Sequence, residues 1–315
     1  MEPVYADDEW DQLNKRSLNN DSERNITRKV LNLLKAYMES ESGDFKIKPS
    51  LVWVFGYWLL SSILMNYINS YAYERIPMEY GPLPDISFNT LSYLFGIKSE
   101  VELPVEISTL VIVSLNIFVY LHALMDWKNN GTRKLRHLFA IHSFLFNLRA
   151  ITIISTSLPV PYKHGPCRED HVEMENHFLA AIQYTFAMGF GELKQIPQCG
   201  DLIFSGHTTF MTIYMLHLFR HAIKGFLLKT LLFLWNSLGL VYIIISRNHY
   251  TIDVVLAMIL SVLAHYLFYS LLHLSYITNE YSSSLVGRFL KWVDYGGFKD
   301  YQDLETDNSP EINSN

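Results

Sequence analysis

The chain has 315 residues, of which 50% are hydrophobic and 18% are charged, and its formal net charge is −6. The negative charge is concentrated at the two ends of the chain, and nothing in it indicates nucleic acid binding. A soluble domain can have this composition, so the distribution of the apolar residues has to decide the class of protein.

The first 45 residues are polar and charged, which does not fit a cleaved signal peptide. Within them, residues 22–39 place six apolar side chains at helical spacing opposite Arg24, Arg28 and Lys35. This pattern predicts a basic amphipathic helix that packs on the rest of the protein or lies on the cytosolic leaflet. We therefore expect residues 1–49 to form a cytosolic tail that contains one amphipathic helix.

Six long apolar runs follow, each close to the ~20 residues that an α-helix needs to cross a bilayer core. They are residues 51–68, 107–125, 138–158, 202–219, 226–245 and 252–274. Buried helices of a soluble protein would not give six such runs between polar connectors. The sequence predicts an all-α membrane protein whose catalytic domain spans residues 50–276 and has six transmembrane helices.

The distribution of Lys and Arg predicts the orientation of these spans. With the N-terminus in the cytosol, the cytosolic segments carry eighteen Lys and Arg and the opposite segments carry six. Both termini are therefore expected on the cytosolic side. Residues 277–315 would form a second cytosolic tail, partly disordered, because residues 300–315 are rich in Asp, Glu, Asn and Ser.

The two cysteines and a glycosylation sequence agree with this orientation. Cys167 and Cys199 both fall between the third and fourth runs, on the predicted luminal side, where a disulfide can persist. A disulfide and two unpaired thiols both remain open. The sequon at Asn130 lies on the predicted cytosolic side, where it would not be glycosylated.

Histidines within the apolar runs are candidate functional residues, because ionisable groups are costly inside a membrane. His207 lies near the luminal end of the fourth run, and His249 lies just before the sixth, at the same depth. His217, His265 and His273 lie deeper toward the cytosol. Only His207 and His249 are therefore expected to form a pair.

Asp253 follows His249 by four residues, a spacing that puts both side chains on one face of a helix. The carboxylate would orient the imidazole for attack on a phosphorus atom, and His207 would serve as general acid and base. Ser205 and Thr208 could donate hydrogen bonds to phosphate oxygens. The alternative for His249 and Asp253 is a buried polar pair that braces two helices.

Four motifs in order resemble those of the sphingomyelin synthase family, relatives of the lipid phosphate phosphatases, over roughly residues 50–275. They are residues 81–88 (GPLPDISF), the stretch from Arg149 through 158–161 (LPVP) to Cys167, residues 199–208 (CGDLIFSGHT) and residues 249–255 (HYTIDVV). The resemblance implies a six-span protein with a lipid-phosphatase-like core. It also implies a catalytic triad of His207, His249 and Asp253 that faces the exoplasmic leaflet.

The same resemblance implies transfer of phosphocholine from phosphatidylcholine to ceramide, giving sphingomyelin and diacylglycerol, with no metal and no cofactor. Its partners would be these membrane lipids, and it leaves a homo-oligomer open. The expected location is the Golgi membrane, the plasma membrane or both. Neither location is favoured by the residues themselves.

Three further residues are expected near the substrate. Arg149 lies inside the third run, where it would either hold phosphate or brace acidic neighbours. Asn248 stands where the family usually has an acidic residue associated with head-group choice, and Arg247 beside it could contact phosphate. Because of Asn248, the choice between choline and ethanolamine as the head group stays open. Two other functions also stay open: a lipid phosphatase or phospholipase C-like hydrolase, and a non-enzymatic lipid-binding protein.

Overall fold

The computed structural model describes residues 51–77, 79–95, 106–126, 130–161, 176–187 and 202–294. Within these ranges every regular element is an α-helix, which confirms the predicted all-α class. The predicted amphipathic helix over 22–39, the pair Cys167 and Cys199, and the predicted disordered segment over 300–315 lie outside the described residues.

Five helices are long and apolar enough to cross a membrane, among the described residues. They are α3 (Leu51–Glu74), α5 (Glu106–Met125), α6 (Gly131–Ser155), α10 (Phe226–Ile245) and α11 (Thr251–Ile277). Large apolar side chains on their outer faces are exposed, such as Leu227 on α10 and Phe118 on α5. Such a surface fits a lipid environment, where apolar side chains carry no cost of hydration.

The fourth predicted span forms helix α9 (Gly206–His221), which has only 16 residues. It starts four residues later than predicted because Ser205 caps it: the Ser205 Oγ accepts a hydrogen bond from the Thr208 N–H at 3.3 Å. At 1.5 Å per residue α9 is about 24 Å long, less than the ~30 Å of a bilayer core. Almost all its side chains from Thr208 to Leu218 are buried, so α9 is the central helix of the bundle.

The predicted third span, residues 138–158, is misplaced: helix α6 begins seven residues earlier and ends three residues earlier. The turn before it is tight: a Cβ added to Gly131 would lie 2.2 Å from the backbone oxygen of Ala123, so only glycine fits. The shift changes the place of Arg149, which lies six residues from the end of α6, or about 9 Å. In the predicted run over 138–158 Arg149 would lie near mid-span; in the structure it lies closer to the end of the helix.

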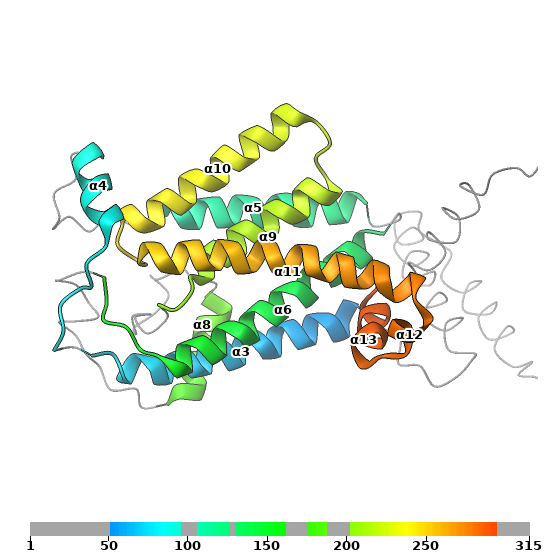
Figure 1. Ribbon diagram of the computed structural model, residues 1–315, viewed down its shortest axis with the longest axis horizontal. Helices are drawn as coiled ribbons and strands as arrows, with labels where there is room; N and C mark the ends of the chain where they lie inside the picture. The colour runs from blue at the N-terminus through cyan, green and yellow to red at the C-terminus, as the bar shows by residue number, and fades with distance from the viewer. Residues whose placement is uncertain are drawn as a thin grey trace, which may run out of the picture. The chain divides into compact units, whose positions relative to one another are not determined.

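Consecutive long helices run in opposite directions along one common axis (Figure 1). At the left of the view α6 ends and both α9 and α11 begin; we call this the histidine end, since it holds His207 and His249. At the right α6 begins and α9 and α11 end. We call this the aspartate end, after Asp294, which lies there.

Four shorter helices complete the described fold: α4 (Ile86–Phe95), α8 (His177–Ala187), α12 (Asn279–Ser283) and α13 (Leu285–Val293). The sequence reasoning expected none of them. Helix α8 packs on α3, where Asn66 Nδ2 donates to Thr185 Oγ1 at 3.0 Å. Helix α13 packs against α6 and α11 at the aspartate end.

Candidate active site

The two predicted histidines lie together at the histidine end. His207 is in the first turn of α9, and His249 is two residues before the first residue of α11. Their ring centroids are 6.3 Å apart and the ring planes are inclined at 61°. His249 is buried, with 2% of its surface exposed, and His207 is half-buried.

Asp253 lies beside His249, with its Oδ2 3.7 Å from the His249 Nδ1. This distance is too long for a hydrogen bond, and the Nδ1 has no other hydrogen-bond partner among the described residues. The Asp253 Oδ2 instead accepts the backbone N–H of Tyr250 at 3.1 Å, which caps the start of α11. The carboxylate is thus fixed by the helix terminus and within a short movement of the imidazole.

The histidine-bearing ends of α9 and α11 are joined through the backbone. The Ser205 N–H donates to the backbone oxygen of Asp253 at 3.1 Å. His207 follows Ser205 by two residues, so this bond fixes the two histidine-bearing segments relative to each other. Both α9 and α11 also point their N-termini at this region, an arrangement that favours the binding of a phosphate group.

Asp85 holds the first turn of α11 in place, a contact that the sequence reasoning did not identify. Its Oδ2 accepts the Thr251 N–H and its Oδ1 accepts the Thr251 hydroxyl, both at 2.7 Å. Its Oδ1 also accepts the Ser87 N–H at 2.9 Å. The only signal in the sequence was the place of Asp85 in the motif at residues 81–88.

Tyr250 links three of the four sequence motifs. Its hydroxyl donates to the backbone oxygen of Pro159 at 2.9 Å and accepts the Leu83 N–H at 2.9 Å. Its ring stacks on Phe88, with centroids 5.8 Å apart. The motifs that precede the histidines in sequence therefore contact the segment between His249 and Asp253.

Arg149 lies next to the start of α9 and is 3% exposed. Its Nε donates to the backbone oxygen of Phe204 at 2.8 Å. Its guanidinium lies against Gly206, where an added Cβ would be 3.1 Å from Cζ. Of the two predicted roles for Arg149, holding phosphate stays a prediction, whereas the described contact braces a carbonyl rather than an acidic neighbour.

Ser205 and Thr208 lie in the first turn of α9, and both are fully buried. Ser205 is engaged as the helix cap described above. The Thr208 Oγ1 has no hydrogen-bond partner among the described residues. A donor in this position remains available to a ligand near His207.

Asn248 and Arg247 form the turn between α10 and α11. The Asn248 Nδ2 donates to Ser246 Oγ at 2.7 Å. Arg247 has a positive φ of 56°, uncommon for a residue other than glycine, and its Cζ lies 5.2 Å from the centre of the Phe88 ring. The described contacts of these two side chains are thus with Ser246 and Phe88, and their expected contacts with the substrate stay a prediction.

In the described residues no group of three or more His, Cys, Asp and Glu side chains is arranged to hold a metal ion. The chemistry that the described site offers is that of two imidazoles, a carboxylate and two helix N-termini. Such a set can transfer a proton and attack an electrophilic phosphorus atom.

Comparison with known proteins tests the resemblance. Residues 198–271 match the family model described as the PAP2 superfamily C-terminal. The chain is 30% identical to phosphatidylcholine:ceramide cholinephosphotransferase 2 of Mus musculus over 230 residues, which are 69% of this chain and 60% of the relative. The putative phosphatidylcholine:ceramide cholinephosphotransferase 3 of Caenorhabditis elegans is 35% identical over 202 residues, 61% of this chain and 54% of that protein.

The resemblance to the sphingomyelin synthases is confirmed. Sphingomyelin synthase-related 1 of Caenorhabditis elegans is also similar, 25% identical over 82% of this chain and 51% of its own length. The chain thus spans between about half and 60% of the length of these three relatives. The matched PAP2 segment covers α9, α10, most of α11 and the turn before α11. It therefore includes His207, His249 and Asp253 of this sphingomyelin synthase-like chain.

Proposed function

We propose that this chain is a membrane enzyme that transfers phosphocholine from phosphatidylcholine to ceramide, giving sphingomyelin and diacylglycerol. The observation that carries the proposal is the pairing of His207 and His249, 6.3 Å apart between ring centroids, with Asp253 beside His249. The names of the relatives, phosphatidylcholine:ceramide cholinephosphotransferases, support these substrates.

In the first step His249 is the nucleophile. Its Nε2 attacks the phosphorus of phosphatidylcholine, and an N–P bond forms as the P–O bond to the glycerol oxygen breaks. Protonated His207 gives its proton to that oxygen, so that diacylglycerol leaves as a neutral alcohol. Asp253 moves into hydrogen-bond distance of the Nδ1–H and stabilises the positive charge on the attacking ring.

In the second step neutral His207 takes the proton of the ceramide primary hydroxyl. The hydroxyl oxygen attacks phosphorus, the N–P bond breaks, and sphingomyelin forms while His249 returns to its free state. Arg149 and the N-termini of α9 and α11 would stabilise the phosphate oxygens during both steps. Exclusion of water by the surrounding helices would favour ceramide over water as the acceptor.

The proposed topology has six spans, with α9 as the fourth, both termini cytosolic, and the histidine end on the luminal or extracellular side of the Golgi or plasma membrane. The position of α9 among helices of spanning length supports this count. Asn130, at the aspartate end, tests it: the sequon there would stay unglycosylated in cells. A sequon newly placed in the connection between α4 and α5 would be modified.

The second candidate function is transfer of phosphoethanolamine, instead of phosphocholine, to ceramide. Asn248 keeps this candidate open, because this neutral amide, which donates to Ser246, brings no negative charge to meet either choline or ethanolamine.

Expression in cells that lack sphingomyelin, fed with labelled ceramide, separates these candidates. A labelled sphingomyelin product supports the first proposal, and labelled ceramide phosphoethanolamine supports the second. Release of phosphocholine without ceramide would reveal a hydrolase and overturn both. His249→Ala must abolish the product, and His273→Ala, an exposed histidine toward the other end of α11, is the matched control and must leave it.

A further inference from the structure

A second pocket lies at the aspartate end. It is a cavity of about 170 Å³ between the start of α6, the end of α9 and the last third of α11. Its lining residues are Asn130, Arg133, Lys134, His137, Arg220, His221, Tyr269 and Leu272. His221 follows His207 by 14 residues on α9, about 21 Å along the helix, so the pocket is separate from the histidine end.

The pocket has an excess of positive charge. Arg133, Lys134 and Arg220 line it, and no carboxylate does, among the described residues. Two of these cations are paired behind the lining: the Arg133 Nε with Asp294 Oδ1 at 2.5 Å, and Lys134 with Asp126. Arg220 lies on the ring of Tyr269, with its Cζ 3.7 Å from the ring centre, which leaves its charge uncompensated by any described acid. The N-terminus of α6 adds partial positive charge.

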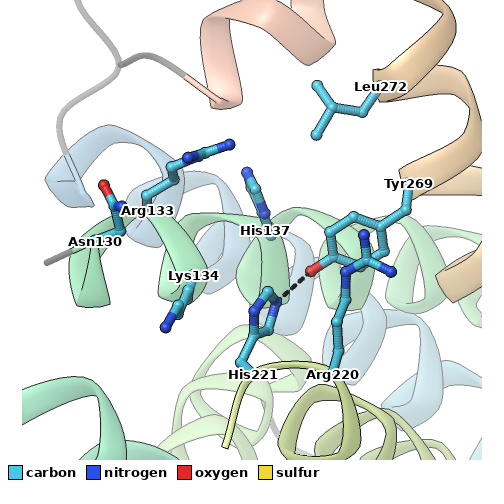
Figure 2. Close-up of a pocket in the computed structure, with 8 residues that line it drawn as sticks. All are labelled: Asn130, Arg133, Lys134, His137, Arg220, His221, Tyr269 and Leu272. Atoms are coloured by element: carbon cyan, nitrogen blue, oxygen red, sulfur yellow. Dashed lines mark hydrogen bonds between the residues drawn. The ribbon is translucent and has the colours of Figure 1, made fainter. Parts of the chain in front are cut away.

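The lining side chains come from opposite sides of the pocket. Figure 2 shows Arg133 and Lys134 on one side and Arg220 with Tyr269 on the other, with His137 and His221 between them. The His137 side chain is 4% exposed; its Nε2 pairs with Asp294, and its Nδ1 has no hydrogen-bond partner among the described residues. The His221 Nε2 is hydrogen-bonded to the Tyr269 hydroxyl at 2.9 Å. The buried and unpartnered Nδ1 of His137 is costly unless a ligand or water completes its hydrogen bonding.

The size and position of the pocket restrict the class of ligand that it can bind. A volume of about 170 Å³ corresponds to roughly five or six water molecules, which suits one phosphate group but no acyl chain. The pocket lies at helix ends, where apolar spans meet the polar head groups of a bilayer. Among the described residues no carboxylate lines the pocket, and the ring of Tyr269 is already covered by Arg220. Both features disfavour phosphatidylcholine, whose quaternary ammonium group needs a negative or aromatic partner.

We propose that this pocket binds the phosphomonoester head group of an anionic lipid, such as phosphatidate, at the end of the bundle opposite the catalytic histidines. A phosphomonoester carries a charge of about −1.5 to −2 at neutral pH and three acceptor oxygens. Arg220 donates to these oxygens from one side, and Lys134 and Arg133 from the other. Binding there joins α6, α9 and α11, and it does not depend on the reaction proposed for the histidine end.

Asn130→Asp is the sharpest test, because it adds a negative charge to the lining at no conformational cost. Asn130 has a positive φ of 106° before α6, and aspartate tolerates that conformation and the helix N-cap as well as asparagine does. Arg220→Gln, which removes a positive charge, is the second variant. Lys224→Gln is the matched control, since Lys224 is an exposed cation at the same end that does not line the pocket.

The full chain, purified in detergent micelles, would be titrated with short-chain phosphatidate, with inorganic phosphate and with short-chain phosphatidylcholine, and binding read by native mass spectrometry. We expect saturable phosphatidate binding that weakens about tenfold in Asn130→Asp and in Arg220→Gln and less than twofold in Lys224→Gln. If inorganic phosphate displaces phosphatidate at similar concentrations, the pocket is a phosphate site whose ligand is a soluble phosphate. If inorganic phosphate does not displace it, the ligand of the pocket is the lipid.

Equal phosphatidate binding by wild type and a folded Asn130→Asp would overturn the proposal. So would an equal loss in Lys224→Gln, or equal binding of phosphatidylcholine at this pocket. Thermal unfolding of each variant establishes that it is folded, and Asn130→Asp decides the question if Arg220→Gln is unstable through loss of its contact with Tyr269.

Discussion

The two ends of the helix bundle use buried charge in opposite ways. At the aspartate end, Asp294 is fully buried and saturated: it accepts from Arg133 at 2.5 Å, pairs with His137 at 2.7 Å and accepts from the Tyr276 hydroxyl at 2.6 Å. At the histidine end, Asp253 lies 3.7 Å from His249, and the His249 Nδ1 is without a hydrogen bond among the described residues.

This difference separates a stabilising network from a reactive one. A buried carboxylate with all its partners in place holds helices together, because removing any partner leaves an uncompensated charge. A carboxylate held near an imidazole by a helix terminus, but not bonded to it, can respond when the ring becomes charged. We therefore expect substitutions at the histidine end to change the rate, and substitutions at the aspartate end to change stability.

The largest effect is expected for His249→Ala. Loss of the nucleophile should lower the rate of sphingomyelin formation by a factor of about 10³ or more. The melting temperature should change by less than about 5 °C, because no described hydrogen bond to the ring is lost. Turnover of labelled ceramide measures the rate, and thermal unfolding in the same micelles measures the melting temperature. Unchanged turnover, or an unfolded variant, would contradict the expected difference between the two ends of the bundle.

Asp294→Asn should have the opposite effect: it should lower stability and leave the turnover rate nearly unchanged. Removing the buried charge leaves Arg133 without its counter-ion, at a cost of about 3 kcal/mol in the free energy of unfolding. Turnover per folded molecule should stay within about twofold of wild type. Thermal unfolding and specific activity decide this, and a variant with full stability but lost activity would contradict a structural role for Asp294.

Gly206→Ala tests the contact between α9 and Arg149. The new Cβ would lie 3.1 Å from the guanidinium carbon, so Arg149 must shift by a few tenths of an ångström. We expect the turnover rate to fall about 10- to 100-fold with little loss of stability. Gly225→Ala is the control, since its Cβ would meet nothing within 4 Å; equal effects in the two variants would sink the interpretation.

Asp85→Asn tests whether the start of α11 is positioned from outside the matched PAP2 segment. Asparagine offers one acceptor oxygen, so one of the two bonds to Thr251 is lost. We expect kcat to fall about tenfold while KM changes little, since the histidines lose alignment rather than substrate contact. Glu79→Gln, an exposed acid in the same loop, should have no effect; a change in KM alone would argue against positioning.

The smallest effect is a pH dependence of stability at the aspartate end. Burial raises the pKa of Asp294, but hydrogen bonds from His137, Arg133 and Tyr276 outweigh it, and the net pKa lies below the usual value. A lowered pKa in the folded state stabilises the fold above the unfolded pKa of about 4, and this contribution is lost as pH falls through the folded pKa. The difference in melting temperature between wild type and Asp294→Asn should therefore shrink below about pH 4, and a constant difference would contradict it.

Much of the fold followed from the apolar runs, because a helix that faces lipid must be apolar along its whole length. Helix α10 was predicted to the residue over 226–245, and α11 within three residues at each end. Helix α6 was misplaced because Arg133, Lys134 and Arg136 interrupt hydrophobicity while still belonging to the helix. Helix α13 is short and amphipathic, so no run of apolar residues marks it.

At the site, the sequence placed His207 and His249 at one end because the direction of each span fixes the depth of its residues. It could not place Asp85 against Thr251, or Tyr250 against Pro159, since such contacts join residues 166 and 91 positions apart. The pocket at the aspartate end was missed for the same reason: its cations come from α6 and α9, and singly each fits the cytosolic excess of positive charge.

The central claim is that the histidine end forms a covalent bond to phosphorus through His249. Protein would be mixed with phosphatidylcholine labelled in its phosphate, without ceramide, quenched in alkali, and mapped by mass spectrometry. The account predicts an acid-labile phosphocholine group on the peptide that contains His249, absent in His249→Ala and discharged by ceramide. Label on another residue, or turnover with no label on the protein, would contradict it.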